Sequence, residues 1–213
     1  MTPHEAVYLR YSELEGAAIT FGSTVYQKTI TMSQLFDFIS TPVAGCFDIQ
    51  PHVLADHRGK FVKAFHSEAF RKRGLPDTFQ CVKYAAYNRH VVRGLHFQHP
   101  PHSSDHVAYS VQGSFLKVVV DLRKSSPTYR KVHSVRLEAE RGNMLYYPAG
   151  VAHGFMALDD KSIHLMLSTR EEHTEFKGGL HWRSIDFDWP VQNPIVSDDD
   201  NRLPHLAHYA SPF

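Results

Sequence analysis

The chain has 213 residues, of which 23 are lysine or arginine and 22 are aspartate or glutamate. This length fits one domain with a substantial core, and the balanced charge excludes an extended nucleic-acid-binding surface. No apolar run approaches the ~20 residues of a membrane span, and the amino terminus lacks the layout of a signal peptide. Cys46 and Cys81 are too few for a secreted disulfide framework, so we expect a cytoplasmic protein with reduced thiols.

The first part of the chain differs from the rest. Four apolar residues between Met32 and Ile39 recur at helical spacing, and Pro42 ends the pattern. We therefore expect an N-terminal extension over residues 1–42, with a helix that packs on the body or on a second subunit. Residues 43–213 would form the single main domain.

From Ala44 onward, short apolar segments alternate with turn signals. The segments are rich in Val, Phe, Tyr and Leu, and they include KFVKAF, TFQCVKYAAY, HVAYSVQG, FLKVVVDL, KVHSVRLEA, NMLYYP and SIHLMLS. One short helix is expected, with Ser67 as its N-cap and Gly74 at its end. Many short strands with almost no helix predict an antiparallel β-sandwich or barrel.

The segment GNMLYYPAGVAHGF contains a spaced set of turn residues. Gly142 is followed by Pro148, Gly150 and His153 at the spacing of the second cupin signature, which marks small jelly-roll barrels. A strand would end at Pro148, which cannot donate to a ladder, and Gly150 would permit a tight turn. The next strand would then point His153 into the barrel, where small barrels bind ligands.

The first cupin signature, which supplies most of the metal ligands, is incomplete in this sequence. No His-x-His pair stands at the required distance before Gly113, and His106 occupies the place of the signature's glutamate. A three-histidine metal site built from His102, His106 and His153 remains an alternative.

Several segments taken together resemble, in order and spacing, the dTDP-4-dehydrorhamnose 3,5-epimerase family. These segments are DHRGKF, VRGLHFQ, VVVDLRKSSPTY, YPAGVAHGF and the late DWP and SDDD, all within residues 45–204. The resemblance implies an all-β cupin jelly-roll barrel with one short helix, preceded by the N-terminal extension. It also implies a homodimer that binds a nucleotide sugar and needs no metal or other cofactor, and no nucleic-acid or membrane partner is expected.

The resemblance assigns roles to residues of the expected cavity. Members of this family remove a proton beside the ketone of a nucleotide-linked 4-keto-6-deoxy sugar, stabilise the enolate and return a proton to the opposite face. By resemblance, His96 would be the base and Asp200 would fix its tautomer. Arg93 would lie near the sugar and diphosphate, and His153 beside the keto oxygen.

Residues of the DHRGKFVK segment would bind the nucleotide. The resemblance implies that Arg58 reaches the diphosphate from the neighbouring subunit, where a bidentate guanidinium suits the geometry, and that Phe61 packs near the base. Lys63 departs from the family, in which an acidic residue that helps to read the base is common at this place.

Two further departures fall on the proton-donating side of the site. His106 replaces a lysine that polarises the ketone, and Met166 replaces a tyrosine that acts as the opposing acid. A thioether has no proton to give, so we expect inversion at C5 to be slow or absent. C3 could still invert if a water molecule or His164 supplied the proton.

The sequence therefore predicts an epimerase that inverts C3, with or without C5, of a nucleotide-linked 4-keto-6-deoxy sugar. The nucleotide could be dTDP, GDP or CDP. Two alternatives stay open: a metal-dependent cupin oxygenase or isomerase, and a member of the family that binds sugar nucleotides without turnover.

Overall fold

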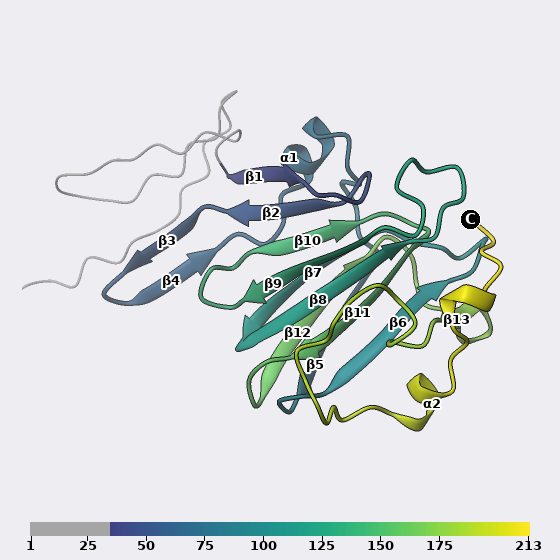
Figure 1. Cartoon of the computed structure of the whole chain (residues 1–213). Coiled ribbons are helices and arrows are strands. Elements are labelled where there is room, and N and C mark those ends of the chain that lie inside the picture. The colour runs from purple at the N-terminus through teal and green to yellow at the C-terminus, as the bar shows by residue number, and fades with distance from the viewer. Residues whose placement is uncertain (1–34) are drawn as a thin grey trace, which may run out of the picture.

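The computed structural model describes residues 35–213, and two antiparallel sheets form its body (Figure 1). The six-stranded sheet has the order β1 (Phe36–Ser40), β2 (Phe47–Pro51), β10 (Met144–Tyr147), β7 (His106–Gln112), β12 (Ser162–Ser168) and β5 (Cys81–Tyr87). The five-stranded sheet has the order β13 (Lys177–Gly179), β6 (Val92–Gln98), β11 (Val151–Ala157), β8 (Ser114–Asp121) and β9 (Val132–Glu138). This architecture confirms the all-β cupin jelly-roll prediction.

The apolar core lies between the two sheets because their inner faces alternate with outward polar residues. Ala108 of β7 and Leu145 of β10 pack against Val119 of β8 and Leu137 of β9, and all four are fully buried. The expected strands are present, and the helices are few and short, although only the first of them was expected from the sequence. These helices are α1 (Ser67–Lys72), α2 (Asp198–Asn201) and the 3₁₀ helices η2 (Thr174–Phe176) and η3 (Leu206–His208).

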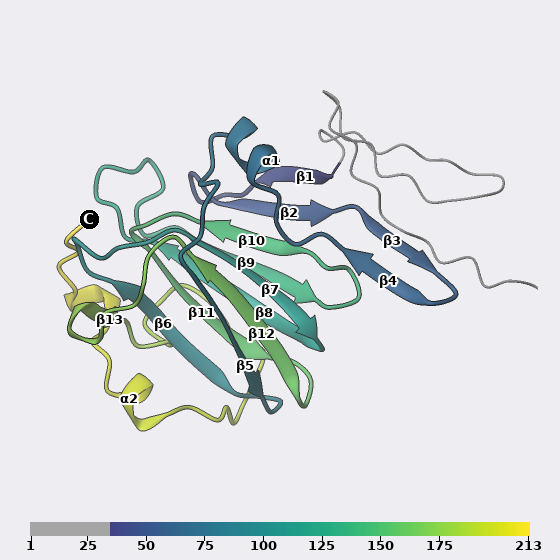
Figure 2. The ribbon, with the colours of Figure 1, turned by 180° about the vertical axis from the view of Figure 1, so that it is seen from behind.

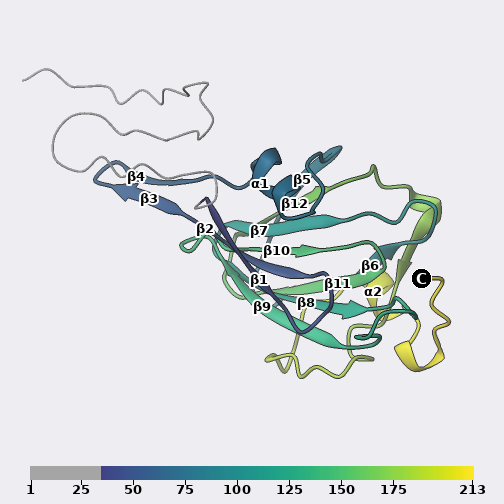
Figure 3. The ribbon, with the colours of Figure 1, turned by 90° about the horizontal axis from the view of Figure 1, so that it is seen from above.

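A third, two-stranded sheet extends from one end of the barrel. It consists of β3 (Val53–Asp56) and β4 (Gly59–Val62), and we call this hairpin the arm. The arm points away from the body at the end opposite the C-terminus (Figures 1 and 3). It carries Arg58 in its turn and a partly exposed Phe61 on β4.

The prediction of a helix before Pro42 is wrong for residues 35–42, the part of the predicted segment that the structure describes. Phe36–Ser40 is the edge strand β1, paired with β2. Phe36 and Phe38 both contact the ring of Phe70, a residue of α1, which lies beside β1 (Figure 2). Pairing with β2 and aromatic packing override the helical spacing. Met32 lies outside the described residues.

The short helix α1 differs from expectation by one residue at its start. Its N-cap is His66, whose side chain makes no capping bond, and Ser67 is the first helical residue. Gly74 follows the C-cap with φ of +77°, the left-handed conformation expected of a glycine at the end of a helix. No helix within residues 35–213 is long and apolar enough to cross a membrane.

The turn between β10 and β11 follows the sequence prediction. β10 ends directly before Pro148, and Gly150 has φ of +83°. The backbone N–H of Val151 donates to the carbonyl oxygen of Pro148 at 3.2 Å and closes the turn. β11 then carries His153 into the interior of the barrel.

Candidate active site

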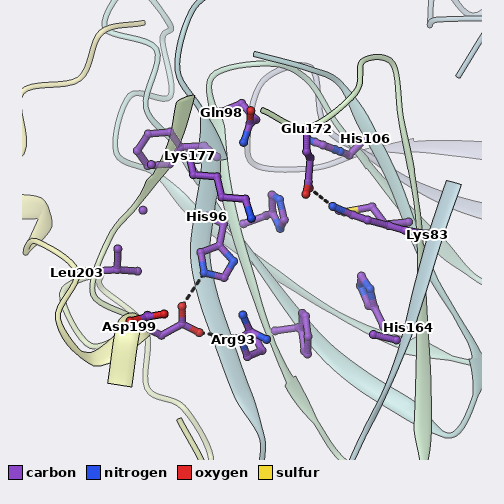
Figure 4. A pocket seen from close by; sticks show the side chains of 18 of the residues that line it. Lys83, Arg93, His96, Gln98, His106, His164, Glu172, Lys177, Asp199 and Leu203 are labelled. Carbon is purple, nitrogen blue, oxygen red and sulfur yellow. Dashed lines mark hydrogen bonds and ion pairs between the residues drawn. The ribbon is translucent and has the colours of Figure 1, made fainter. Parts of the chain in front are cut away.

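A cavity of about 660 Å³ opens between the two sheets. One wall belongs to the five-stranded sheet and its neighbour α2, and we call it the base wall. The other wall belongs to β5, β7 and β12 of the six-stranded sheet, and we call it the far wall. Figure 4 shows His96 and Arg93 on one side, with Lys83, His106 and His164 on the other.

The base wall is organised around one buried carboxylate. Asp200 is 3% exposed, and its Oδ1 lies 2.7 Å from Nε2 of His96. Its Oδ2 accepts from Nε of Arg93 at 2.8 Å and from the backbone N–H of Gly94 at 3.2 Å. Burial opposes ionisation of Asp200, but these hydrogen bonds prevail and hold its pKa well below its usual range. The carboxylate therefore stays charged and can stabilise an imidazolium at His96.

Local sequence explains how the carboxylate reaches the histidine. The side chain of Ser197 accepts from the backbone N–H of Asp200 and caps α2, so the short helix presents Asp200 to β6. Gly94 has φ of +99°, and a Cβ there would lie 2.7 Å from the carbonyl oxygen of His153. A glycine is therefore needed where β6 and β11 approach each other and where Asp200 accepts a backbone hydrogen bond.

His153 stands beside His96 on the base wall, since the two are direct partners in the β6–β11 ladder. Its Nδ1 lies 3.1 Å from Nζ of Lys117, a fully buried residue of β8. Burial, followed by the charge of Lys117, holds the pKa of His153 well below its ordinary value. His153 is therefore a neutral ring at physiological pH, and it lines the cavity.

The far wall holds His106 and Met166, two of the three residues at which the sequence departs from the family. His106 lies at hydrogen-bonding distance from two serines, with Nε2 at 3.0 Å from Ser104 Oγ and Nδ1 at 3.0 Å from Ser168 Oγ. Burial and then the charge of Lys117 lower its pKa to about 3. His106 is thus neutral, and both ring nitrogens already have partners. The sulfur of Met166 accepts from the hydroxyl of Tyr147 at 3.1 Å.

Two more side chains complete the far wall. The ring of His164 stacks on Phe155 at 4.8 Å, and its buried Nε2 has no hydrogen-bond partner within the described part of the chain. Lys83 is the cross-strand neighbour of Met166 and forms an ion pair with Glu172, which also lines the cavity (Figure 4). Burial lowers the pKa of Lys83.

The residues expected to bind the nucleotide lie apart from this cavity. Arg58 pairs with Asp56 within the arm turn, and half of its side-chain surface is exposed. Phe61 is 39% exposed, and neither it nor Arg58 lines the cavity. Lys63 follows β4 and also lies outside the cavity lining.

The three histidines considered as metal ligands do not form one group. His102 lies in the loop after β6, with its ring centroid 3.9 Å from that of His173. The ring centroids of His106 and His153 are 5.2 Å apart, and the partners of His106 are serines. Within residues 35–213, no three His, Cys, Asp or Glu side chains are arranged to hold a metal ion.

Two facing sheets around a cavity with a carboxylate-held histidine define a cupin barrel of the sugar-epimerase class. The comparison with known families agrees, because residues 40–208 match the dTDP-4-dehydrorhamnose 3,5-epimerase family. The chain belongs to this family, and it is a sugar epimerase.

Relatives with assigned activities include both double and single epimerases. The chain is 37% identical to a dTDP-4-dehydrorhamnose 3,5-epimerase of Methanothermobacter thermautotrophicus, over 78% of this chain and 91% of the relative. It is 32% identical to a dTDP-4-dehydrorhamnose 3-epimerase of Streptomyces niveus, over 78% of this chain and 81% of the relative. The crystal structure of the 3,5-epimerase from Sulfolobus tokodaii superposes with a TM-score of 0.76 at 35% identity, covering 82% of this chain and 97% of that one.

Several cavity residues were not anticipated from the sequence. These are Lys83, His99, Lys117, Glu172 and Lys177. A signal for Lys117 was available, because it is a single cation in the middle of the otherwise apolar segment FLKVVV. A charge at the centre of a buried strand is uncommon and marks a candidate functional site.

Proposed function

We propose that the protein inverts C3 of a dTDP-linked 4-keto-6-deoxy sugar by proton abstraction and enolate formation. The observation that carries this proposal is the 2.7 Å contact between His96 and the buried carboxylate of Asp200. A histidine held in this way can accept a proton at its second ring nitrogen while the carboxylate stabilises the resulting imidazolium. The dTDP nucleotide is inferred from the activities of the relatives.

The reaction begins with the C3 hydrogen directed toward His96. The neighbouring ketone makes this hydrogen acidic, and Nδ1 of His96 takes it as Nε2 keeps its bond to Asp200. Negative charge then moves onto the ketone oxygen, where His153 is positioned as a hydrogen-bond donor. A proton returned to the opposite face of C3 gives the inverted sugar.

The far wall supports inversion at C3 in preference to C5. Met166 has no exchangeable proton, and its sulfur accepts the hydroxyl of Tyr147. A carbanion at C5 that faced Met166 would lack a donor, whereas water or His164 could supply one at C3. A related 3-epimerase is consistent with this restricted outcome.

The arm supports the proposal that the protein works as a homodimer. Arg58 and Phe61 are exposed on a hairpin that leaves the barrel, so one chain does not place them at its own cavity. In the proposed dimer, the arm of one subunit supplies Arg58 to the diphosphate bound by the other. The proposed compartment is the cytoplasm, where nucleotide sugars serve as substrates for biosynthesis.

The proposal is tested with a panel of dTDP-, GDP- and CDP-linked 4-keto-6-deoxy sugars in deuterated water. Mass spectrometry and NMR report which carbon gains deuterium, and we expect incorporation at C3 of the dTDP-linked sugar. Metal analysis of the same preparation provides a second criterion. A stoichiometric, tightly held transition metal, or binding without any exchange across the panel, would overturn the proposal.

A further inference from the structure

Lys117 is a buried cation for which the mechanism above has no role. It lies at the centre of β8, it is fully buried, and no carboxylate in residues 35–213 lies within ion-pair distance. Its ammonium group lies 5.2 Å from the ring centroid of Tyr147 and 5.6 Å from that of Phe155. Burying an ammonium ion without a counter-charge costs desolvation free energy, so the buried group needs an interaction that offsets this cost.

The nearest polar partner of Lys117 is His153. The distance from Nζ to Nδ1 is 3.1 Å, and within the described residues Nε2 of His153 has no protein partner. One hydrogen lies between Nζ of Lys117 and Nδ1 of His153, and the lysine is the more basic of the two groups. Burial lowers the pKa of Lys117 to about 7, whereas burial and neighbouring charges hold the pKa of His153 far below 6.5. The proton therefore rests on Lys117, which donates to Nδ1.

This hydrogen bond fixes the tautomer of the imidazole. When Nδ1 accepts from an ammonium group, the neutral ring must carry its own proton on Nε2. His153 lines the cavity beside His96, so an N–H at Nε2 is available to a ligand bound against the base wall. A neutral imidazole can polarise a ketone in this way, and the cation behind it strengthens the effect as negative charge develops.

We propose that Lys117 is a positioning residue that holds His153 as the hydrogen-bond donor to the substrate's ketone oxygen. This inference rests on the proposed epimerase function and adds the source of the positive charge that position 106 does not supply. Lys117 keeps its proton throughout the reaction, while the bond from Nε2 to the enolate oxygen strengthens. The enolate is then a counter-charge for Lys117, which pairs with no carboxylate in residues 35–213.

The arrangement also predicts a loss of activity at alkaline pH. As the pH rises through about 7, Lys117 loses its proton and its amine becomes an acceptor. Nδ1 of His153 can then carry the hydrogen, which leaves Nε2 without one to donate. The titratable groups that face Lys117 are His153 of β11, Tyr147 of β10, His106 of β7, His164 of β12 and Lys83 of β5. None of these groups is an anion at neutral pH, so none of them supplies a counter-charge to the ammonium.

The first test measures the tautomer without substrate. In ¹⁵N-labelled wild-type protein at pH 6, the ring of His153 should carry its proton on Nε2 and leave Nδ1 unprotonated. The His153→Gln variant identifies the resonance. A proton on Nδ1 at pH 6 would overturn the inference, whatever the enzyme does with sugars.

The second test compares Lys117→Met with Lys117→Gln. The thioether of Met preserves volume without a donor, whereas the amide of Gln can still donate to Nδ1 without a charge. We expect Lys117→Met to lower kcat for C3 exchange by about 10²–10³-fold, with KM and dTDP affinity nearly unchanged. Lys117→Gln should recover part of this loss, and neither variant should show the alkaline fall. The control is Lys131→Met, which alters an exposed lysine.

The two proposals fail in different ways. If wild-type protein exchanges no proton on any sugar of the panel, the proposed epimerase function is wrong. The tautomer measurement then still tests whether Lys117 holds the proton of His153 on Nε2. If wild-type protein is active and Lys117→Met retains wild-type kcat and the same alkaline fall, the role of Lys117 is wrong. If Lys117→Met does not fold, the activity of Lys117→Gln and the wild-type NMR spectrum test the role of Lys117.

Discussion

The base wall and the far wall of the cavity differ in what their polar side chains are bonded to. On the base wall, His96 and Arg93 meet at Asp200, and the second ring nitrogen of His96 remains available. On the far wall, both ring nitrogens of His106 lie at hydrogen-bonding distance from serine hydroxyls, and the sulfur of Met166 accepts a hydrogen bond from Tyr147. The base wall is therefore poised to move a proton, whereas most of the far wall is engaged internally.

This difference separates two halves of one reaction. Proton removal needs a base and a stabilised enolate, and in the proposed reaction His96, held by Asp200, is the base, while the Lys117–His153 pair stabilises the enolate. Proton return needs a donor on the opposite face, and at Met166 the far wall has none. An enzyme with one complete wall can exchange protons at two carbons and still invert only one of them.

The largest expected effect comes from removing the base. His96→Asn should lower deuterium incorporation at C3 by about 10²–10⁴-fold, because the amide cannot accept the proton from carbon. Affinity for the nucleotide sugar should stay nearly unchanged, as measured by calorimetry. Wild-type exchange by His96→Asn would show that the base wall does not perform the abstraction.

A donor added to the far wall should change the stereochemical outcome. Met166→Tyr places a phenol where the thioether stands and should give inversion at C5, with general acid assistance contributing about 10²–10⁴-fold at that carbon. Met166→Phe is the matched control, since it adds the same ring without the hydroxyl. Equal C5 inversion by both variants would mean that Met166 only fills the core.

A change outside both walls should affect binding and leave the chemistry intact. Arg58→Ala should weaken nucleoside-diphosphate affinity by about 10- to 150-fold, equivalent to about 1.5–3 kcal/mol for a charged hydrogen-bonded contact. The affinity of Arg58→Lys should lie between those of the wild type and Arg58→Ala, because lysine keeps the charge without the bidentate geometry of the guanidinium. Calorimetry with dTDP measures the effect, and an unchanged Kd would leave the arm without a role in diphosphate binding.

The remaining expected effect is on stability. Asp200→Asn should cost about 1.5–3 kcal/mol of unfolding free energy at pH 7, because the ionised carboxylate accepts three hydrogen bonds. The folded-state pKa of Asp200 is lowered, so its contribution is complete above the unfolded pKa of about 4 and is lost progressively as the pH falls from there through the lower folded-state pKa. Denaturant titrations should show a constant difference in stability from pH 7 to about pH 4 and a narrowing difference from there to pH 3. C3 exchange by Asp200→Asn should fall less than in His96→Asn. A difference in stability that stays constant down to pH 3 would point to packing instead of charge.

Local patterns in the sequence were sufficient for the strands and the turn that position His153. Pro148 and Gly150 each leave the backbone few conformations, so the turn could be predicted from these residues alone. The spacing between Met32 and Ile39 was misleading because pairing with β2 and contact with Phe70 decide the structure of Phe36–Ser40. Local periodicity cannot report a partner that lies far away in the chain.

Prediction of the site required knowledge of contacts between segments that lie far apart in the sequence, even more than prediction of the strands did. Asp200 and His96 are separated by 104 residues, and only the resemblance to a family linked them before the fold was known. The serines that engage His106 and the histidine that meets Lys117 lie on neighbouring strands whose register the sequence does not state. For this reason the sequence identified His106 as a departure but did not identify Lys117 as the compensating charge.

The most direct test of the central claim is the configuration of the wild-type product. The dTDP-linked 4-keto-6-deoxy sugar is incubated with the enzyme in deuterated water, and NMR follows the configuration and deuterium content at C3 and C5. We expect a product that is inverted and labelled at C3 and retains its configuration at C5. Inversion at both carbons at comparable rates would contradict this expectation.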